Sequence, residues 1–408
     1  MILARRTHGF RESVIRGMTR LAREHRSINL AQGFPNFPAP DLLKEAAVRA
    51  IHDDINQYAI TWGAQRLREA LSRKYHEWYG LSVDPDREIT VSCGATEGMI
   101  ATLLAVVNPG DEVIVFEPFY ENYGPDAILA DARPVYVTLQ PGAPLDVDRL
   151  RAAWSSRTRA IIVNTPSNPS GRVLNRDELQ AVADLCQRYD TLAITDEIYE
   201  HIRFDGEHIP IATLPGMRER TVTISGASKT FSVTGWRIGW IVAPAVLTDA
   251  IRKVHDFLTV GAPAPLQEAI AIALDQLDAS FYRQLAVQYR ARRDLLYRAL
   301  VDSGFGCTPP EGAYYILSDF SEVARRAGTP LNDTDFAIWL SREVGVTPVP
   351  GSSFFREGGD GGALVRFVFC KTDDVLQEAA RRLGGLASSS PRPGERPLEP
   401  ASRSGLQS

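Results

Sequence analysis

The central part of the chain alternates short apolar runs with stretches of helical periodicity. Six such runs lie between residues 111 and 244: DEVIVFEP, ARPVYVTL, RAIIVNTP, LAITDEI, TVTIS and IGWIVAP. Apolar runs of this length, separated by helical patterns, are typical of buried parallel strands joined by crossover helices. The pattern therefore predicts an α/β fold with a largely parallel sheet between helices.

The pattern is different on either side of this region. Apolar positions at helical spacing predict helices at 12–25 and 41–53, the second with Asp41 as its N-cap. The Gly- and Pro-rich segment between them, INLAQGFPNFPAP, predicts a loop. Beyond about residue 280 the composition changes, and we expect a smaller α+β domain. Its predicted elements are helices at 281–300, 333–344 and 373–383 and strands at 313–318 and 365–370.

These changes divide the chain into four predicted parts. We expect an N-terminal segment at 1–44 that packs with the smaller domain, a large domain at 45–284 and the smaller domain at 285–386. Residues 387–408 are rich in Ser, Pro, Arg and Gly, which predicts a disordered tail.

The composition of the 408 residues narrows the classes of function. The net charge of −5 means that acidic residues outnumber basic ones, so we expect no nucleic-acid partner. The four cysteines lie far apart without a CxxC pair, which favours reduced thiols over a disulfide or metal framework. No apolar run approaches the roughly 20 residues of a membrane span, and the N-terminus lacks an apolar signal segment. We therefore expect a cytoplasmic protein with no membrane partner.

Polar residues whose side chains can take part in binding or catalysis follow several predicted strands, at the point where each strand ends. Ligands of parallel sheets bind at the carboxyl ends of the strands, so these side chains are expected to share one site. The residues are, in chain order, Tyr120, Asn168, Asp196, Tyr199 and Lys229.

One lysine lies among small residues directly after a predicted buried strand, in the segment SGASKTFSVTGWRIGW at 225–240. Desolvation at such a position disfavours the ammonium form and would make Lys229 a usable nucleophile. A solvated loop lysine is the alternative. Lys229 and Thr230 do not complete a Walker motif, because that motif needs Gly before the lysine and Ser228 stands there. No GxGxxG follows a strand, which disfavours nicotinamide binding.

A second turn of small residues, from Cys93 to Thr96, opens an apolar helix after a short strand at 88–92. The free amides of Ala95 and Thr96 and the positive end of the helix favour a phosphate group. Many turns of this kind bind nothing, so the turn alone does not establish an anion site.

The segment at 225–240 resembles the cofactor-lysine segment of the class I aminotransferases, the fold-type I enzymes of pyridoxal 5′-phosphate (PLP). It is most similar to their kynurenine, glutamine and methionine aminotransferase branch, and the resemblance extends from about residue 12 to about residue 383. It implies a large PLP-binding domain with a mostly parallel, seven-stranded type of sheet and a smaller domain. It also implies a homodimer with shared active sites.

The resemblance implies the groups that hold the cofactor. Lys229 would bind the PLP aldehyde as a Schiff base and then act as general base, while Asp196 would keep the ring nitrogen protonated. Some aminotransferases carry a phosphate-binding serine three residues before the lysine, where this chain has Gly226. The residues implied around the phosphate are Ala95, Thr96, Ser228 and Arg237, with Tyr58 from the partner subunit.

The resemblance also implies contacts to the ring and to the substrate. Asn168 and Tyr199 would donate hydrogen bonds to the phenolic oxygen of PLP, and Tyr120 would stack on the ring. The implied substrate-binding residues are Gly33, Asn168, Tyr123 and Arg366, of which Arg366 would grip the α-carboxylate through two parallel hydrogen bonds.

Local chemistry leaves structural alternatives open. Gly33 is also consistent with a simple turn glycine and Tyr58 with a packing tyrosine. Asp196 is also consistent with a helix N-cap and Asn168 with a turn asparagine. Arg366 is a lone arginine in an apolar strand and needs an anion, because burying an unpaired guanidinium is costly. That anion is either a substrate carboxylate or an internal ion-pair partner.

We therefore expect a PLP-dependent aminotransferase that exchanges an amino group between an α-amino acid and a 2-oxo acid. The branch implies an aromatic, kynurenine, methionine or glutamine type of amino acid, and no residue selects one of them. A first alternative keeps PLP but performs β- or γ-elimination, replacement, oxidation or carbon–carbon bond formation. A second is a non-catalytic PLP-binding regulator, for whose usual DNA-binding domain the N-terminal segment leaves no room.

Overall fold

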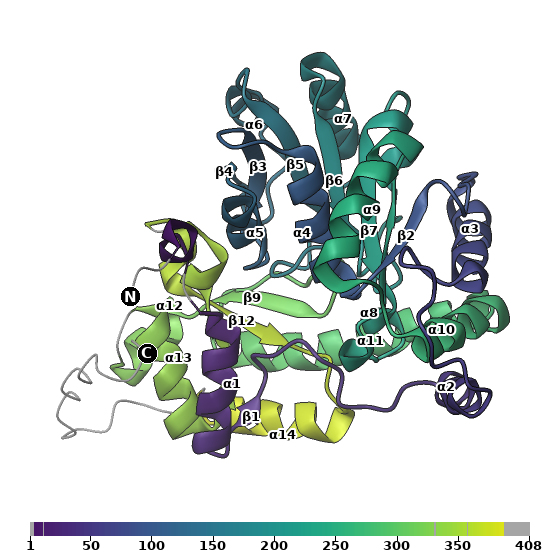
Figure 1. Cartoon of the computed structure of the whole chain (residues 1–408). Helices are drawn as coiled ribbons and strands as arrows, with labels where there is room; N and C mark the ends of the chain where they lie inside the picture. Colours follow the sequence, from purple (N-terminus) through teal and green to yellow (C-terminus); the bar gives the residue numbers. More distant parts are fainter. Residues whose placement is uncertain (1–3, 11, 330–331, 357, 387–408) are drawn as a thin grey trace.

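The computed structural model describes residues 4–10, 12–329, 332–356 and 358–386. Its centre is a seven-stranded sheet in the order β2-β8-β7-β6-β5-β3-β4 (Figure 1). Strands from β7 to β4 pair in parallel, whereas β8 is antiparallel to both of its neighbours. The predicted α/β fold with a mostly parallel sheet is confirmed. The strands are β2 (Ile89–Ser92), β3 (Glu112–Glu117), β4 (Arg133–Thr138), β5 (Thr158–Asn164), β6 (Leu192–Asp196), β7 (Thr221–Gly226) and β8 (Gly239–Val242).

Helices cover both faces of this sheet, which is why its strands have continuous apolar sequences. Val113 and Val115 of β3 pack into one core, and Ile114 and Phe116 pack into the other. The first core is closed by α4 (Gly94–Val106), α5 (Tyr123–Leu129) and α9 (Ala245–Thr259). The second is closed by α6 (Val147–Ala152) and α7 (Arg176–Tyr189).

Three further helices pack together beside the β2 edge of the sheet (Figure 1). They are α2 (Asp41–His52), α3 (Gln65–Tyr79) and α10 (Ala264–Gln276). The prediction that Asp41 caps α2 was wrong: the N-cap is Pro40, and Asp41 is the first helical residue. Proline has no N–H to lose and fits the start of a helix, while Asp41 pairs with Lys44 at 2.6 Å.

The C-terminal elements form a separate layer with its own core. A three-stranded antiparallel sheet in the order β11-β12-β9 lies beside the long helix α11, and the N-terminal strand β1 pairs with β10. The strands are β1 (Ile28–Asn29), β9 (Tyr315–Asp319), β10 (Val346–Thr347), β11 (Val349–Pro350) and β12 (Leu364–Val368). The helices are α1 (Val14–Glu24), α11 (Ala279–Asp302), α12 (Ser321–Ala327), α13 (Asp333–Trp339) and α14 (Asp373–Gly384).

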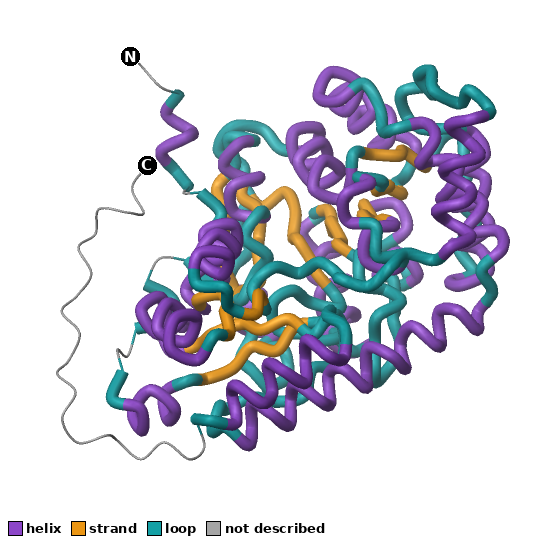
Figure 2. Tube along the Cα trace, turned by 90° about the horizontal axis from the view of Figure 1, so that it is seen from below, coloured by secondary structure: helices purple, strands orange, loops and turns teal. Residues whose placement is uncertain are grey.

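Short helical turns complete the described chain, and Figure 2 shows from below how helices surround the strands. The turns are η1 (Arg5–His8), η2 (Ile211–Thr213), η3 (Arg218–Arg220), α8 (Ala227–Thr230), η4 (Thr234–Trp236), η5 (Leu340–Val344), η6 (Gly351–Phe354) and η7 (Asp360–Ala363). Among the described residues, no helix combines the length and apolarity needed to cross a membrane. The tail predicted at 387–408 lies outside the described residues, and the predicted domain boundaries remain predictions.

Candidate active site

The carboxyl ends of β5, β6 and β7 meet at one edge of the large sheet. Asn164, the last residue of β5, lies opposite Asp196, the last residue of β6, and Asp196 lies opposite Ile224 of β7. The Asn164 amide donates to the main-chain oxygen of Asp196 at 2.9 Å and accepts from the Asn168 N–H at 2.7 Å. Asn164 thus fixes two loops of the site, although the sequence argument assigned it no role.

Lys229 lies in the short helix α8, directly beyond β7. Its Nζ donates to the main-chain oxygen of Gly33 at 3.3 Å. Burial lowers the pKa of Lys229 to about 8, against the opposing influence of Cys370 and Asp196 and with support from Arg237. An amine with this pKa is partly neutral near physiological pH, so the side chain has the nucleophilic character that the sequence predicted.

Asp196 is a buried carboxylate with neutral partners. Its Oδ2 accepts from the Tyr123 hydroxyl at 2.7 Å, and its Oδ1 accepts from the Ile198 N–H at 3.2 Å. Burial raises the pKa of Asp196, and these two hydrogen bonds together with the charge of Lys229 oppose that rise. The residues after it form a turn at 198–201 rather than a helix, so the N-cap alternative does not apply.

Tyr123 lies in α5, and the structure places its hydroxyl on Asp196. The sequence argument assigned Tyr123 to the substrate pocket and did not anticipate this bond. The neighbouring Tyr120 meets Tyr123 edge-on, with 5.7 Å between ring centroids. Both rings therefore lie beside the carboxylate, Tyr120 from the loop after β3 and Tyr123 from the first residue of α5.

The N-terminus of α4 lies beneath a guanidinium group. Arg237 has φ of 56° and donates to the main-chain oxygens of Thr234 at 3.1 Å and Cys93 at 3.5 Å. A Cβ at Gly94 would collide with this guanidinium, so only glycine allows the approach. Ala95 and Thr96 follow in the first turn of α4. Arg237 has no carboxylate partner among the described residues, which leaves its charge free for an anion beside the helix end.

Arg366 is fully buried in β12, between the rings of Tyr315 and Phe354. Its Nη1 donates to Asn168 Oδ1 at 2.8 Å and its Nη2 to the main-chain oxygen of Ala31 at 2.6 Å, while Nε has no partner. No ion pair to Arg366 occurs among the described residues, so the internal ion-pair alternative finds no support. Because Asn168 accepts from Arg366 through its oxygen, its NH₂ group is left to donate.

Gly33 lies between Lys229 and two tyrosines. Its main-chain oxygen also accepts from the Tyr314 hydroxyl at 2.8 Å, and a Cβ at Gly33 would lie 2.5 Å from the Tyr315 hydroxyl. The glycine is therefore needed for close approach rather than for a turn. Tyr199 completes this group, with its hydroxyl 2.6 Å from that of Tyr315.

Two predicted site residues, Ser228 and Tyr58, have side chains that make no hydrogen bond to the other candidates within the described residues. Ser228 is buried beside Lys229, and its hydroxyl makes no hydrogen bond to another described residue. Tyr58 is 89% exposed and makes no hydrogen bond or ring contact to the other candidates within the described chain. The sequence argument also missed Tyr315, the first residue of β9, although its ring lies 4.8 Å from that of Tyr314 and both tyrosines reach Gly33.

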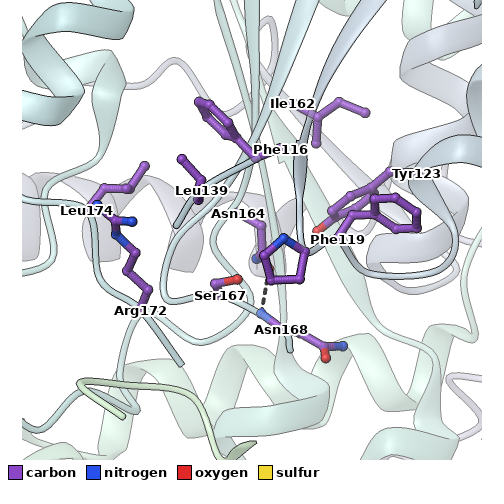
Figure 3. A pocket seen from close by; sticks show the side chains of 11 residues that line it. Phe116, Phe119, Tyr123, Leu139, Ile162, Asn164, Ser167, Asn168, Arg172 and Leu174 are labelled. Carbon is purple, nitrogen blue, oxygen red and sulfur yellow. Dashed lines mark hydrogen bonds between the residues drawn. The ribbon is translucent and has the colours of Figure 1, made fainter. Parts of the chain in front are cut away.

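A small pocket opens between the loops after β3 and β5, and its wall includes two of the candidate residues, Tyr123 and Asn168 (Figure 3). Phe119 and Tyr123 lie on one side of the pocket, and Arg172 and Leu174 lie on the opposite side. The dashed line in Figure 3 is the bond that holds Asn168 to Asn164. Among the described residues, no group of three or more His, Cys, Asp or Glu could hold a metal ion.

These groups fit a cofactor with an aldehyde, a cationic ring and a phosphate, and a buried arginine without an ion-pair partner among the described residues lies next to them. The profile of the family "Aminotransferase class I and II" matches residues 26–383. The chain belongs to this family and is a PLP-dependent aminotransferase. The expectations for family, reaction and cofactor are thereby confirmed, and the alternative of a non-transaminating PLP reaction is not supported.

Curated relatives and solved structures agree with this assignment over most of the chain. The probable N-succinyldiaminopimelate aminotransferase DapC of Mycobacterium tuberculosis is 40% identical, over 94% of this chain and 98% of the relative. The methionine aminotransferase of Escherichia coli is 39% identical, over 90% and 94%. The solved structure of the Mycobacterium tuberculosis enzyme has a TM-score of 0.90 and covers 95% of this chain and all of that one.

Proposed function

We propose that the convergent residues perform the transamination, with Lys229 as the catalytic group. The observation that carries this proposal is the meeting of a lysine of lowered pKa, an unpaired buried carboxylate and an unpaired buried arginine at one sheet edge. None of the three groups forms an ion pair with another described residue, and each fits one part of the cofactor or substrate.

Lys229 attaches PLP and later moves a proton. When bound, PLP supplies an electron sink that labilises bonds at the substrate α-carbon. Lys229 Nζ would hold the aldehyde of the cofactor and, once an amino acid has taken that place, would act as general base for the α-proton. Its pKa of about 8 suits this task, since a base is most effective when its pKa lies near the working pH.

Asp196 holds the proton on the ring nitrogen through the charge of its carboxylate. A buried carboxylate opposite a cationic ring satisfies both groups, and the Tyr123 hydroxyl keeps the carboxylate oriented. Asn168 and Tyr199 would donate to the phenolic oxygen of PLP, and Tyr120 would cover the ring face. Ala95, Thr96, Ser228 and Arg237 would hold the phosphate.

The substrate would be an α-amino acid whose carboxylate pairs with Arg366, beside Asn168. The named relatives act on succinyldiaminopimelate, kynurenine or methionine, so we propose a substrate of aromatic, kynurenine, methionine or glutamine type. A 2-oxo acid accepts the amino group in the second half of the exchange.

We further propose that two copies of the chain share their active sites in the cytoplasm. Tyr58 is 89% exposed in this chain, and Phe257 is 92% exposed near the end of α9, where His255 binds the main-chain oxygen of Thr61 at 2.8 Å. Exposed aromatic side chains of this kind mark interfaces, and Tyr58 would reach the phosphate in the partner subunit. Four free cysteines, two of them buried, are consistent with a reducing compartment.

The proposal is tested with protein purified in the presence of PLP. Borohydride reduction should label Lys229 in a peptide mass map, and Lys229→Ala should abolish the label. Incubation with each candidate amino acid alone should convert the bound cofactor to pyridoxamine phosphate, measured by chromatography after denaturation. A label on another lysine, or no conversion with any α-amino acid, would contradict the proposed roles.

A further inference from the structure

Two buried tyrosine hydroxyls meet at the junction of the two sheets. The hydroxyl oxygens of Tyr199 and Tyr315 lie 2.6 Å apart, and their rings cross edge-on at 89°. Tyr199 follows β6 of the large sheet, whereas Tyr315 begins β9 of the C-terminal sheet. Both side chains are at most 3% exposed, so neither hydroxyl relies on bulk water for its hydrogen bonds.

The number of protons available determines which of the two tyrosines donates the hydrogen bond between them. A phenol has a single proton to donate. If Tyr199 donates its proton to the phenolic oxygen of the cofactor, the bond between the tyrosines requires Tyr315 as its donor. The third hydroxyl nearby, that of Tyr314, already donates to the main-chain oxygen of Gly33 at 2.8 Å.

We propose that Tyr315 is a positioning residue of the transamination site, acting through Tyr199. Its hydroxyl donates to the Tyr199 oxygen, turns the Tyr199 O–H toward the cofactor and strengthens that O–H as a donor. Hydrogen bonds arranged in a chain polarise one another, so the second donor adds to the first. This inference rests on the proposed function, in which Tyr199 donates to the phenolic oxygen.

Three neighbours fix the Tyr315 side chain in this position. Its ring covers the guanidinium of Arg366, with 4.5 Å from Cζ to the ring centroid. Its backbone pairs with Val368 of β12, the strand that carries Arg366. On the third side lies Gly33, where a Cβ would come within 2.5 Å of the hydroxyl. The Tyr315 ring therefore packs on Arg366, while the Tyr315 hydroxyl contacts Tyr199.

The charged and titratable groups around the pair keep both hydroxyls protonated. Burial raises the pKa of Tyr315 to about 12, although Arg366 opposes this rise. Burial raises the pKa of Tyr199 well above its ordinary value, and the charge of Asp196 adds to the effect. The other titratable groups that interact with the pair are Tyr120, Tyr289, Tyr314 and Cys370. Both phenols therefore remain donors throughout the working pH range.

The test is Tyr315→Phe in the PLP-loaded enzyme, read by the visible absorption of the bound cofactor against pH. Weaker donation to the phenolic oxygen should move the midpoint of this titration upward by about half a pH unit. The phenylalanine ring still covers Arg366, so kcat should fall while KM for the amino acid stays within about twofold. An unchanged midpoint, or a change in KM alone, would overturn the proposal.

Tyr289→Phe is the matched control. Tyr289 is a fully buried tyrosine of the same core that stacks on Tyr314, and its hydroxyl has no hydrogen-bond partner among the described residues. The substitution removes one hydroxyl from the core and leaves the hydrogen bond between Tyr315 and Tyr199 intact. The midpoint should stay in place, and a shift equal to that of Tyr315→Phe would assign the effect to the core rather than to the chain of hydroxyls.

Tyr199→Phe separates this inference from the proposed function. It should raise the midpoint further than Tyr315→Phe, and adding Tyr315→Phe to it should bring no additional shift, since the two act in series. If Tyr199→Phe leaves the midpoint unchanged, the proposed role of Tyr199 fails. If Tyr199→Phe shifts it and Tyr315→Phe does not, only the inference on Tyr315 fails.

Discussion

At the scale of single residues, the charge that most constrains the active site is Arg366. Its guanidinium is fully buried, held by one side-chain amide and one main-chain oxygen, and stacked between two rings. Neutral acceptors do not balance a buried positive charge, so the site is electrostatically complete only with an anion in place.

Arg366→Lys should weaken amino-acid binding while leaving PLP in place. Lysine keeps the charge but cannot form two parallel hydrogen bonds to a carboxylate, so KM should rise roughly 30-fold, equivalent to about 2 kcal/mol. Steady-state kinetics with the best substrate of the screen measure the change, and the visible spectrum reports whether PLP remains bound. A KM close to that of the wild type would remove Arg366 from carboxylate recognition.

Sequence patterns found the charged residues of the site better than its neutral ones. A lone arginine in an apolar strand and a lysine after a buried strand are conspicuous because burial of a charge is costly. Tyr315 and the bond from Tyr123 to Asp196 left no such signal, since tyrosines are common in cores and their partners come from distant segments. Only the fold shows which tyrosine hydroxyl reaches which acceptor.

At the scale of elements, a buried polar network anchors the turn that carries Asp196 and Tyr199. Glu200, at the end of this turn, accepts from Lys74 of α3 at 2.6 Å and from Ser225 of β7 at 2.9 Å. The Tyr79 hydroxyl donates to the same carboxylate. The turn after β6 is thus tied to α3 and β7 one residue beyond Tyr199.

Lys74→Met should destabilise the fold strongly. The Lys74 and Glu200 side chains are 5% and 3% exposed, and removal of one partner leaves a buried charge, at a cost of about 3–5 kcal/mol. Urea unfolding measures the loss. The control is Arg73→Met on the same helix, which breaks a half-exposed pair with Asp275 and should cost at most about 1 kcal/mol. Equal losses for the two variants would contradict a special role for the buried pair.

The free energy of unfolding of Lys74→Met should change with acidification in the opposite direction from that of the wild type. Burial works against ionisation of Glu200, but Lys74 holds its pKa well below the ordinary 4.5, so the stabilisation is present above pH 4.5 and is lost on further acidification. Without Lys74, burial should raise the pKa of Glu200. As the pH falls, protonation then removes the unpaired buried charge and stabilises the folded state of the variant. The gap in stability between variant and wild type should therefore narrow from pH 7 to pH 5.

The elements themselves were largely predictable, and the exceptions have local causes. Continuous apolar runs identified the strands because both faces of the sheet are covered. The start of α2 was misplaced because Pro40 serves as its N-cap, although proline lacks the side-chain acceptor that marks most helix starts. The antiparallel direction of β8 follows from its connection through the turn at Lys229, which apolar patterns do not encode.

At the scale of the whole molecule, the described chain exposes an apolar surface beside its active site. His255 Nε2 binds the main-chain oxygen of Thr61 at 2.8 Å, which joins the end of α9 to the loop that carries Tyr58. Large apolar side chains gather on these two segments: Ile55, Tyr58, Ile60, Phe257, Leu258 and Val260. A surface of this kind is typical of a protein interface, and a second copy of the chain is the proposed occupant.

Phe257→Glu should therefore separate the subunits and weaken PLP binding together. A charge placed in an apolar interface opposes association, and a monomer would lack the partner's contribution to the phosphate site. Light scattering coupled to size-exclusion chromatography reports the mass, and equilibrium dialysis reports the affinity for PLP. Val246→Glu, at the opposite end of α9 and 81% exposed, is the matched control and should change neither quantity. A Phe257→Glu protein that keeps the wild-type mass would contradict an interface at this surface. A monomer that keeps the wild-type affinity for PLP would show that each subunit binds the cofactor without Tyr58 of its partner.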